Sequence, residues 1–179
     1  MTVPASHSGL RRRVSRLRLA VSVLLLLVLG YVLFLFNSGG LRTFQVISRS
    51  MEPALAVGDY VLMKRVGRDQ PLRGAIVTVE NPQVNGELLA KRVIAADGDE
   101  VQLRDGMIFI NGRRETANRP RIEHVPDQTW KVAPGEVFVV GDNRNDSLDS
   151  VDFGPLPIDR VHGILVYRYW PPNRAGRLQ

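Results

Sequence analysis

The feature that most limits how this chain can fold is an unbroken apolar run at residues 19–36 (LAVSVLLLLVLGYVLFLF). It contains no ionisable group apart from Tyr31, and because it is apolar on every face, a buried soluble helix fits it poorly. As a helix, its 18 residues span about 27 Å, close to the hydrocarbon thickness of a bilayer. A cleavable signal peptide is disfavoured, because the run is long for such a core and no A-x-A pattern follows it. The run therefore predicts a retained transmembrane anchor.

Positive charge is concentrated on the N-terminal side of this run. Of the 24 basic residues in the chain, five arginines lie in residues 1–40, together with no acid. The remaining 19 basic residues (24 less five) nearly balance all 18 acids, which disfavours a nucleic-acid-binding body. By the positive-inside rule, we expect a basic cytoplasmic tail at 1–18, the anchor at 19–36 and an extracytoplasmic domain at 37–179.

The chain contains no cysteine. An extracytoplasmic domain without cysteine has no disulfide bonds and no thiolate chemistry. Cysteine proteases, sortase-like transpeptidases and Cys-ligated zinc sites are therefore excluded.

The part of the chain after the anchor has the pattern of a small β domain. Short apolar segments are separated by Gly, Pro and Asn turns, and no helical period of useful length occurs. We expect strands at 44–47, 60–63, 75–79, 88–95, 101–104, 107–110, 137–140 and 164–169. Asp105-Gly106 predicts a hairpin, Asn111-Gly112 predicts a second tight turn, and residues 113–131 are polar and irregular. The expected fold is mostly β: a small antiparallel, coiled, barrel-like sheet with one N-terminal transmembrane helix, and with a hairpin and loop insertion at about 101–136.

Two serines two positions apart occur where the strand at 44–47 ends. Ser48 and Ser50 lie in the sequence Ser-Arg-Ser-Met-Glu-Pro at 48–53. One serine can attack a carbonyl carbon while the other donates a hydrogen bond to the oxyanion that forms. Taken alone, this short sequence is more often a simple turn.

Of the 24 Lys and Arg residues in the chain, only three are lysines, and Lys91 is one of them. Arginine cannot act as a base at neutral pH, whereas lysine can once its pKa falls. In an extended segment, Lys91 shares its face with the apolar Leu89 and Val93, and Arg92 lies on the opposite face. At an ordinary pKa, roughly one lysine in 2,500 is neutral at pH 7, and burial can lower that pKa by up to about 3–5 units. A solvated strand lysine is the alternative interpretation.

An acidic loop, Gly-Asp-Asn-Arg-Asn-Asp-Ser-Leu-Asp-Ser at 141–150, follows the strand expected at 137–140. A calcium site is disfavoured, because Arg144 interrupts the D-x-D-x-D pattern and no bidentate Glu follows at the required distance. The alternative is a hydrogen-bonded loop that orients other groups, with Ser147 directed toward an amine and with Asp142 and Asp149 directed toward arginines.

Taken together, these segments resemble the bacterial type I signal peptidases (leader peptidases), which are Ser/Lys-dyad serine proteases. The resemblance rests on the anchor and on the segments at 48–55 (SRSMEPAL), 58–61 (GDYV), 91–94 (KRVI), 98–101 (GDEV), 104–112 (RDGMIFING) and 141–150. Each segment is modest, but their order and spacing are specific. The resemblance implies a serine endopeptidase of the bacterial cytoplasmic membrane that removes N-terminal signal peptides from exported preproteins, with no cofactor and no metal.

The resemblance also implies the catalytic roles. Ser50 would be the nucleophile, and Lys91 would be the general base. The Ser50 backbone N–H and the Ser48 hydroxyl would form the oxyanion hole, and Ser147 would hold Lys91 in position.

Further positions would support this site. The resemblance implies that Asp142 pairs with Arg92 and that Asp149 stabilises the loop. The family usually has an arginine two residues after this aspartate, where the present chain has Val151. We therefore expect Asp149 to find another partner in Arg144. This departure affects the loop and not the dyad.

In such enzymes the substrate lies extended and adds to a sheet edge, here between residues near 44–47 and 88–90. Shallow pockets would accept alanine-sized residues at the first and third positions before the cut, which gives Ala-x-Ala specificity. The expected lining residues are Ile47, Met51, Leu55, Leu89 and Ala90. The expected partners are signal peptides of exported preproteins and the lipid bilayer, in proximity to the secretion translocon, and no nucleic acid.

Two other functions remain open at this point. One is the dedicated maturation of a single exported or conjugation substrate, and the other is a non-catalytic anchored domain that only binds exported chains. LexA-like autoproteases lack the anchor and carry a DNA-binding domain. Signal peptidases of the endoplasmic reticulum type need a histidine at the Lys91 position, and all three histidines of this chain lie elsewhere.

Overall fold

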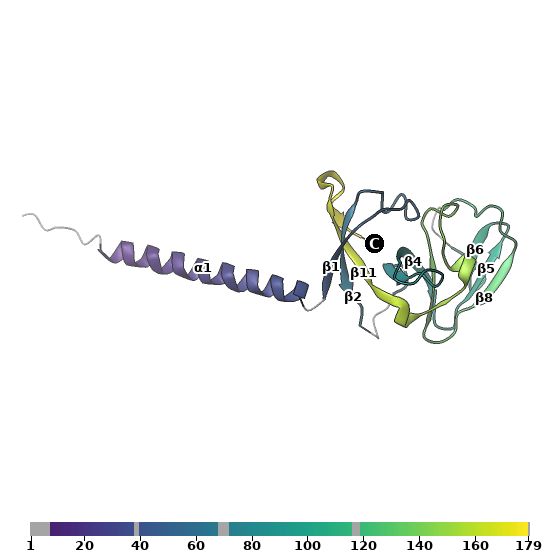
Figure 1. The fold of residues 1–179 in the computed structure, drawn as a ribbon, viewed down its shortest axis with the longest axis horizontal. Coiled ribbons are helices and arrows are strands. Elements are labelled where there is room, and N and C mark those ends of the chain that lie inside the picture. The colour runs from purple at the N-terminus through teal and green to yellow at the C-terminus, as the bar shows by residue number, and fades with distance from the viewer. Residues whose placement is uncertain (1–7, 38–39, 68–71, 116–118, 179) are drawn as a thin grey trace, which may run out of the picture. The chain divides into compact units, whose positions relative to one another are not determined.

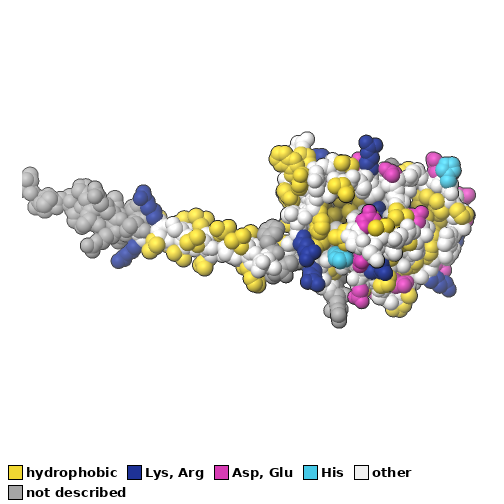
Figure 2. All heavy atoms as spheres, in the orientation of Figure 1, with side chains coloured by type: hydrophobic (Ala, Val, Ile, Leu, Met, Phe, Trp, Pro, Cys, Tyr) yellow, Lys and Arg dark blue, Asp and Glu magenta, His cyan; other side chains and the backbone are white. Residues whose placement is uncertain are grey.

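The computed structural model describes residues 8–37, 40–67, 72–115 and 119–178. The chain divides into two units, Met1–Gly40 and Leu41–Gln179, each of which is described by itself (Figure 1). The first unit contains the helix α1 (Ser8–Asn37). Within it, Arg16–Phe34 is long and apolar enough to cross a membrane, and Figure 2 shows hydrophobic side chains along this helix.

The second unit consists of two antiparallel sheets. The larger sheet has the strand order β1-β2-β11-β3-β4-β9-β10, with β12 paired to β11, and the smaller sheet has the order β7-β6-β5-β8. The strands of the larger sheet are β1 (Leu41–Gln45), β2 (Tyr60–Arg65), β3 (Ile76–Glu80), β4 (Leu88–Ala96), β9 (Glu136–Val140), β10 (Leu156–Pro157), β11 (Val161–Trp170) and β12 (Gly176–Arg177). Those of the smaller sheet are β5 (Glu100–Arg104), β6 (Met107–Ile110), β7 (Arg113–Arg114) and β8 (Gln128–Lys131). The prediction of a mostly β, antiparallel domain with one N-terminal apolar helix is confirmed.

Strand β4 contributes to all three hydrophobic clusters of this unit. Leu89 and Val93 pack into one cluster, Ala90 packs against a second, and Ile94 and Ala95 belong to the third. An irregularity in the pairing with β9 lies between Val93 and Ala95, where the strand changes the faces it presents. In Figure 1, β4 lies between the β1–β2–β11 part of the larger sheet and the smaller sheet. Contact with all three clusters holds the side chains of β4 in place.

The predicted hairpin is present, as is the second tight turn. Val101 pairs with Ile110, and the two-residue turn between β5 and β6 has positive φ at both Asp105 (48°) and Gly106 (71°). Asn111-Gly112 makes the same kind of turn between β6 and β7, with φ values of 52° and 75°. Both turns have the backbone that their Asx-Gly sequences favour.

Two strands of the smaller sheet were not predicted. Residues 113–131 were expected to be irregular, but β7 and β8 form in this part of the chain. Strand β8 has a single buried side chain, Trp130, whose ring lies 5.1 Å from that of Phe138 in the core. One buried aromatic residue among polar neighbours gives no alternating pattern, so the strand depends on tertiary packing. The insertion is therefore a four-stranded sheet and not only a hairpin and loop.

Candidate active site

The turn that carries Ser50 follows β1 and is closed by its own backbone. The Glu52 N–H donates to the Arg49 carbonyl at 3.0 Å, and the Leu55 N–H donates to the Met51 carbonyl at 2.9 Å. Ser50 is 8% exposed, and its Oγ lies 3.3 Å from the Oγ of the more exposed Ser48, so either hydroxyl can donate to the other.

The backbone N–H of Ser50 has no acceptor among the described residues. It can therefore donate to an incoming oxygen. Together with the Ser48 hydroxyl, it supplies two donors on one short segment. Two donors that converge on one oxygen can stabilise an oxyanion in acyl transfer, so this segment has the groups that such a site needs.

The residues expected to line the substrate pockets differ widely in exposure. Ile47 is 83% exposed, and Leu89 and Ala90 are half-buried. Met51 and Leu55 are fully buried, because the turn folds back and places both side chains in the hydrophobic cluster beneath it. Both are expected from the sequence to line shallow pockets, and with this burial they could do so only from beneath, so that expectation stays a prediction. They form the floor under this segment.

Lys91 is the largest of the fully buried side chains that the structure describes, with 2% exposure. It lies on β4 opposite Val77 of β3, and its ammonium forms no hydrogen bond or ion pair with any described residue. Burial lowers the pKa of Lys91 below its ordinary value, and the charge of Asp149 is the largest influence in the opposite direction. The amine is therefore neutral more often than an exposed lysine, which is what a general base requires.

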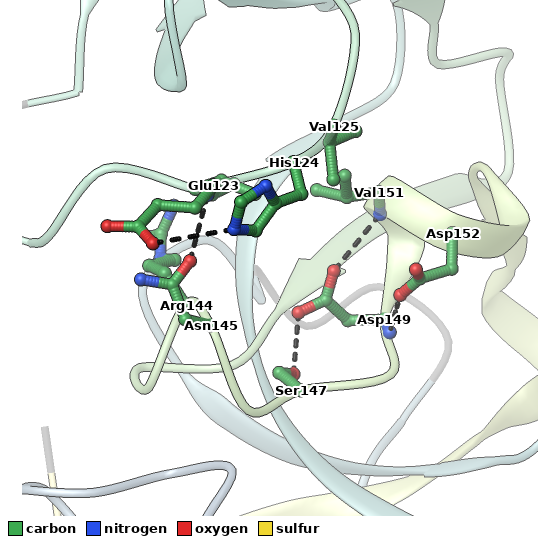
Figure 3. A pocket seen from close by; sticks show the side chains of 10 residues that line it. Glu123, His124, Val125, Arg144, Asn145, Ser147, Asp149, Val151 and Asp152 are labelled. Carbon is green, nitrogen blue, oxygen red and sulfur yellow. Dashed lines mark hydrogen bonds and ion pairs between the residues drawn. The ribbon is translucent and has the colours of Figure 1, made fainter.

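The loop at 141–150 is organised around the buried carboxylate of Asp149 (Figure 3). This carboxylate accepts hydrogen bonds from Gly141 N–H at 2.8 Å, from Ser147 Oγ at 2.6 Å and from Val151 N–H at 3.0 Å. With Asp152 it forms a capping box at the start of the short helix α2 (Ser150–Phe153). Burial raises the pKa of Asp149, and these hydrogen bonds oppose the rise.

Ser147 does not donate a hydrogen bond to Lys91, because its proton goes to Asp149. A hydroxyl has one donor and two acceptor lone pairs, so Ser147 can still accept from an ammonium. The expected contact between Ser147 and Lys91 is not formed among the described residues. The loop is nevertheless close to the lysine, since Asp149, Asp152 and Asp146 all act on the pKa of Lys91.

Gly141 allows this loop to approach the turn that carries Ser50. A Cβ at this position would lie 2.6 Å from the Ser50 carbonyl oxygen and would collide with the Ser147 side chain. Only glycine fits between them. Nothing in the sequence analysis assigned a role to this residue, although a glycine directly after a buried strand is a signal for close approach.

Asn143 joins the loop to the same turn and was also missed. Its backbone N–H donates to the Ser50 carbonyl at 3.0 Å, and its Nδ2 donates to the Arg49 carbonyl at 3.3 Å. These bonds connect residues more than ninety positions apart, so local sequence carries no signal for them.

Arg92 and Asp142 form a bidentate ion pair on the face of β4 away from Lys91. Both of its hydrogen bonds, from Arg92 Nε and NH2, are 2.9 Å long, and Arg92 NH1 also donates to the Gly74 carbonyl at 2.7 Å. Asp142 is buried and also pairs with Arg119 at 2.8 Å. The structure thus places together the two residues that the sequence analysis paired.

Arg144 does not pair with Asp149, and that expectation is wrong. Its guanidinium forms two hydrogen bonds with the Glu115 carboxylate, at 2.9 and 2.8 Å. Asp149 is already satisfied by two backbone N–H groups and the Ser147 hydroxyl, so it needs no arginine. Val151 packs against the hydrophobic cluster that contains Trp130.

Two free strand edges lie beside this site. Strand β9 pairs with β4 only from Arg92 onward, so residues 88–91 of β4 pair with β3 on one side alone. Strand β1 is the end of its sheet and, among the described residues, pairs only with β2. Phe44 of β1 and Ala90 of β4 pack against the same hydrophobic cluster, which brings the two edges to one region. An extended peptide can pair with edges of this kind.

Comparison with known proteins identifies the family. The family model described as signal peptidase, peptidase S26, matches residues 15–170. The signal peptidase I of Leptolyngbya laminosa is 36% identical over 157 residues, covering 78% of this chain and 76% of the relative. The signal peptidase I of Bacillus caldolyticus is 30% identical over 156 residues, covering 78% of this chain and 82% of the relative.

Two further matches cover a smaller share either of the relative or of this chain. The thylakoidal processing peptidase 1 of Arabidopsis thaliana is 34% identical over 159 residues, and this chain spans about half of its length (46%). The crystal structure of a signal peptidase I from Enterococcus faecalis V583 is 32% identical, with a TM-score of 0.46, over 55% of this chain and 99% of that one. The extent of the family match is decisive: the chain belongs to the signal peptidase family, peptidase S26.

Proposed function

We propose that this protein is a membrane-bound serine endopeptidase that removes N-terminal signal peptides from exported preproteins, with Ser50 as the nucleophile and Lys91 as the general base. Membership of the signal peptidase family supports the substrate class. The observation that carries the chemical assignment is Lys91 itself. This lysine is fully buried, its pKa is lowered, and it has no acidic partner in contact among the described residues. Its strand lies next to the loop that hydrogen-bonds to the Ser50 turn.

In the first half of the reaction, Ser50 Oγ attacks the carbonyl carbon of the scissile bond while the neutral Lys91 amine takes the hydroxyl proton. The oxyanion that forms accepts hydrogen bonds from the Ser50 N–H and from the Ser48 hydroxyl, whose positions support this role. Collapse of this intermediate breaks the C–N bond. The leaving amine takes the proton from Lys91, and an acyl-enzyme on Ser50 remains.

In the second half, a water molecule attacks the acyl-enzyme, and Lys91 takes its proton. The ester bond to Ser50 breaks, and the proton returns to the serine oxygen. Each half of the reaction needs an amine that can lose and regain a proton near neutral pH, which burial of Lys91 favours. Ser147, fixed by its hydrogen bond to Asp149, would accept a hydrogen bond from the lysine whenever it is protonated.

Specificity for small residues follows from what surrounds the two free edges. The substrate would pair with residues near 44–47 and 88–90, with its side chains against the half-buried Leu89 and Ala90 and the exposed Ile47. Met51 and Leu55 would close the floor of this surface without being open to it. A floor already filled by side chains excludes large groups and supports cleavage after Ala-x-Ala.

The membrane forms part of this proposal. The apolar helix α1 would span the bacterial cytoplasmic membrane, with the arginine-rich tail in the cytoplasm and the β domain outside, in proximity to the secretion translocon. Within the β domain, Tyr60, Tyr169 and Trp170 are exposed, and Trp170 pairs with Tyr60 across β11 and β2. Exposed tyrosine and tryptophan side chains are typical of surfaces that contact lipid headgroups.

Cleavage of a preprotein with an Ala-x-Ala signal peptide in detergent–lipid micelles tests the proposal. The wild type should cut after the last alanine, whereas Ser50→Ala and Lys91→Ala should be inactive. Lys91→Arg should be inactive too, because it keeps the positive charge but cannot accept a proton. Substantial turnover by Lys91→Arg would contradict the general-base assignment. Binding of preprotein without cleavage by the wild type would instead favour a non-catalytic domain.

A further inference from the structure

A basic groove of about 620 Å³ lies behind the candidate active site. It is bounded by β4 of the larger sheet and by the β6–β7 edge of the smaller sheet. Its charged lining residues are Arg73, Arg92, Arg113, Arg114 and Glu115. Successive side chains of a strand point to opposite faces, so Arg92 and the groove it lines are on the face of β4 opposite the Lys91 amine.

Glu115, the one acid among the described residues that line the groove, and the acids that pair with its arginines are already engaged. Asp99, Asp142 and Glu115 each form an ion pair with an arginine. The partners are Arg73 for Asp99, Arg92 and Arg119 for Asp142, and Arg144 for Glu115. Within the described part of the chain, Arg113 and Arg114 are exposed and form no ion pair. The groove therefore has an excess of positive charge that internal acids do not neutralise.

The two arginines without acidic partners are on a strand edge. Strand β7 is the end of the smaller sheet and, within the part of the chain that the structure describes, pairs only with β6. The outer edge of such a strand offers backbone N–H and C=O groups to an added strand. Arg113 and Arg114 are consecutive in β7, so their side chains lie on opposite faces of the strand, and acidic side chains at consecutive positions of an added strand would meet both.

We propose that this groove binds an extended polypeptide segment rich in Asp and Glu. If the proposed function holds, this segment is the part of a preprotein outside the signal peptide. Only the source of the segment rests on the proposed function; the binding itself does not. The excess of positive charge favours binding of carboxylates, and the unpaired edge of β7 favours binding of an extended backbone. Arg92 would then have two roles. It holds Asp142 through their ion pair, and it lines the groove in which the acidic segment would bind.

A peptide suits this groove better than an anionic lipid surface. The exposed aromatic side chains suited to a bilayer surface are on β2 and β11 (Tyr60, Tyr167, Tyr169 and Trp170), and none of them lines the groove. A lipid headgroup would satisfy the arginines but leave the β7 edge unpaired. An acidic peptide can satisfy both at once.

Binding is measured with the full-length chain carrying Ser50→Ala, in uncharged detergent, so that the result does not depend on catalysis. The probe is a fluorescent peptide in which pairs of consecutive Glu residues are separated by single Ser residues, so that both faces of the added strand carry carboxylates, and the comparison peptide has Gln in place of every Glu. We expect the Glu peptide to bind, with an affinity that falls as salt is added, and the Gln peptide to bind much more weakly. The double variant Arg113→Glu/Arg114→Glu should weaken binding of the Glu peptide about tenfold or more.

The matched control is Lys64→Glu/Arg65→Glu, which changes the net charge equally at two exposed positions of β2 outside the groove. It should leave binding of the Glu peptide nearly unchanged. Equal loss in both double variants, or no loss in Arg113→Glu/Arg114→Glu, would overturn the proposal. So would binding of vesicles with anionic lipid, or of inorganic phosphate, by a protein that ignores the Glu peptide.

A second readout uses two preproteins that differ only in an acidic or a neutral segment after the cleavage site. With wild-type protein, the acidic preprotein should have the lower KM. Arg113→Glu/Arg114→Glu should remove this difference without changing kcat for the neutral preprotein. If neither preprotein is cut, the proposed function fails while the binding measurement still decides whether the groove takes acidic peptides.

Discussion

Ser147 donates a 2.6 Å hydrogen bond to the buried carboxylate of Asp149, two residues further along the same loop. The same carboxylate is the largest single influence that opposes the lowering of the Lys91 pKa by burial. One side chain thus orients the Ser147 hydroxyl and also raises the pKa of Lys91 against the effect of burial. These two roles can be separated by substitution.

The pH dependence of the reaction should respond to Asp149. If neutral Lys91 is the base, kcat/KM rises with pH through the lowered pKa of this lysine. Asp149→Asn removes a negative charge that favours the ammonium, so the pKa should fall further and the rising limb should move to lower pH. Asp152→Asn is the matched control, because Asp152 acts in the same direction with less effect. A rising limb that stays in place, or moves to higher pH, in Asp149→Asn would contradict Lys91 as the titrating group.

Removing the Ser147 hydroxyl should impair positioning more than binding. Ser147→Ala takes away the only side chain of the loop that donates to Asp149 and can still accept from Lys91. We expect kcat to fall by about 10- to 100-fold, since small misplacements of a catalytic group have effects of that size, with little change in KM. Ser147→Thr should restore part of the activity because it keeps the hydroxyl. A variant with a raised KM and an unchanged kcat would show that Ser147 contacts the substrate instead.

Local sequence predicted the parts of this fold that depend on local physics. The Asp105-Gly106 and Asn111-Gly112 turns need positive φ at both positions, and their residue types favour it, so the hairpin was found correctly. Strand β8 was missed because only Trp130 holds it to the core. The burial of Met51 was also missed, since a turn that folds back over a hydrophobic cluster looks in sequence like an exposed loop.

The candidate site divides in the same way. Period-two alternation along β4 placed Lys91 and Arg92 on opposite faces, and the structure has Lys91 buried and Arg92 paired with Asp142. The partner of Arg144 was predicted incorrectly, because Glu115 is distant in sequence and its approach depends on how the smaller sheet packs. Asn143 was not predicted at all for the same reason. Its acceptors are carbonyl oxygens of the Ser50 turn, and these have no side-chain signature.

Gly141 should tolerate no side chain. In Gly141→Ala, the added Cβ would meet the Ser50 carbonyl oxygen at 2.6 Å and the Ser147 side chain, so the loop must move away from the Ser50 turn. We expect a loss of about 1–3 kcal/mol in the free energy of unfolding, together with a larger loss of kcat. The matched control is Gly176→Ala, whose Cβ would meet nothing within 4 Å. Thermal unfolding and cleavage assays on both variants measure the two effects, and a fully active Gly141→Ala would show that the loop need not contact the Ser50 turn.

Lys91 should reduce stability for the same reason that it can act as a base. Its pKa in the folded protein lies below that of the unfolded chain, about 10.4, so between the two values the unfolded chain binds more protons. The free energy of unfolding of the wild type therefore rises with pH through this window. Lys91→Met fills the same space without a titrating group and should be more stable at neutral pH, by on the order of 1–3 kcal/mol, while being inactive. This advantage should shrink as the pH approaches the ordinary pKa of lysine.

Unfolding can be followed by tryptophan fluorescence, since both tryptophans, Trp130 and Trp170, are in the β domain. Lys64→Met is the control for Lys91→Met, because Lys64 is exposed and its removal should change stability little at any pH. If Lys91→Met were no more stable than the wild type at neutral pH, burial of Lys91 would carry no cost and its pKa would be ordinary. A lysine with an ordinary pKa is protonated at neutral pH and could not take the proton of Ser50.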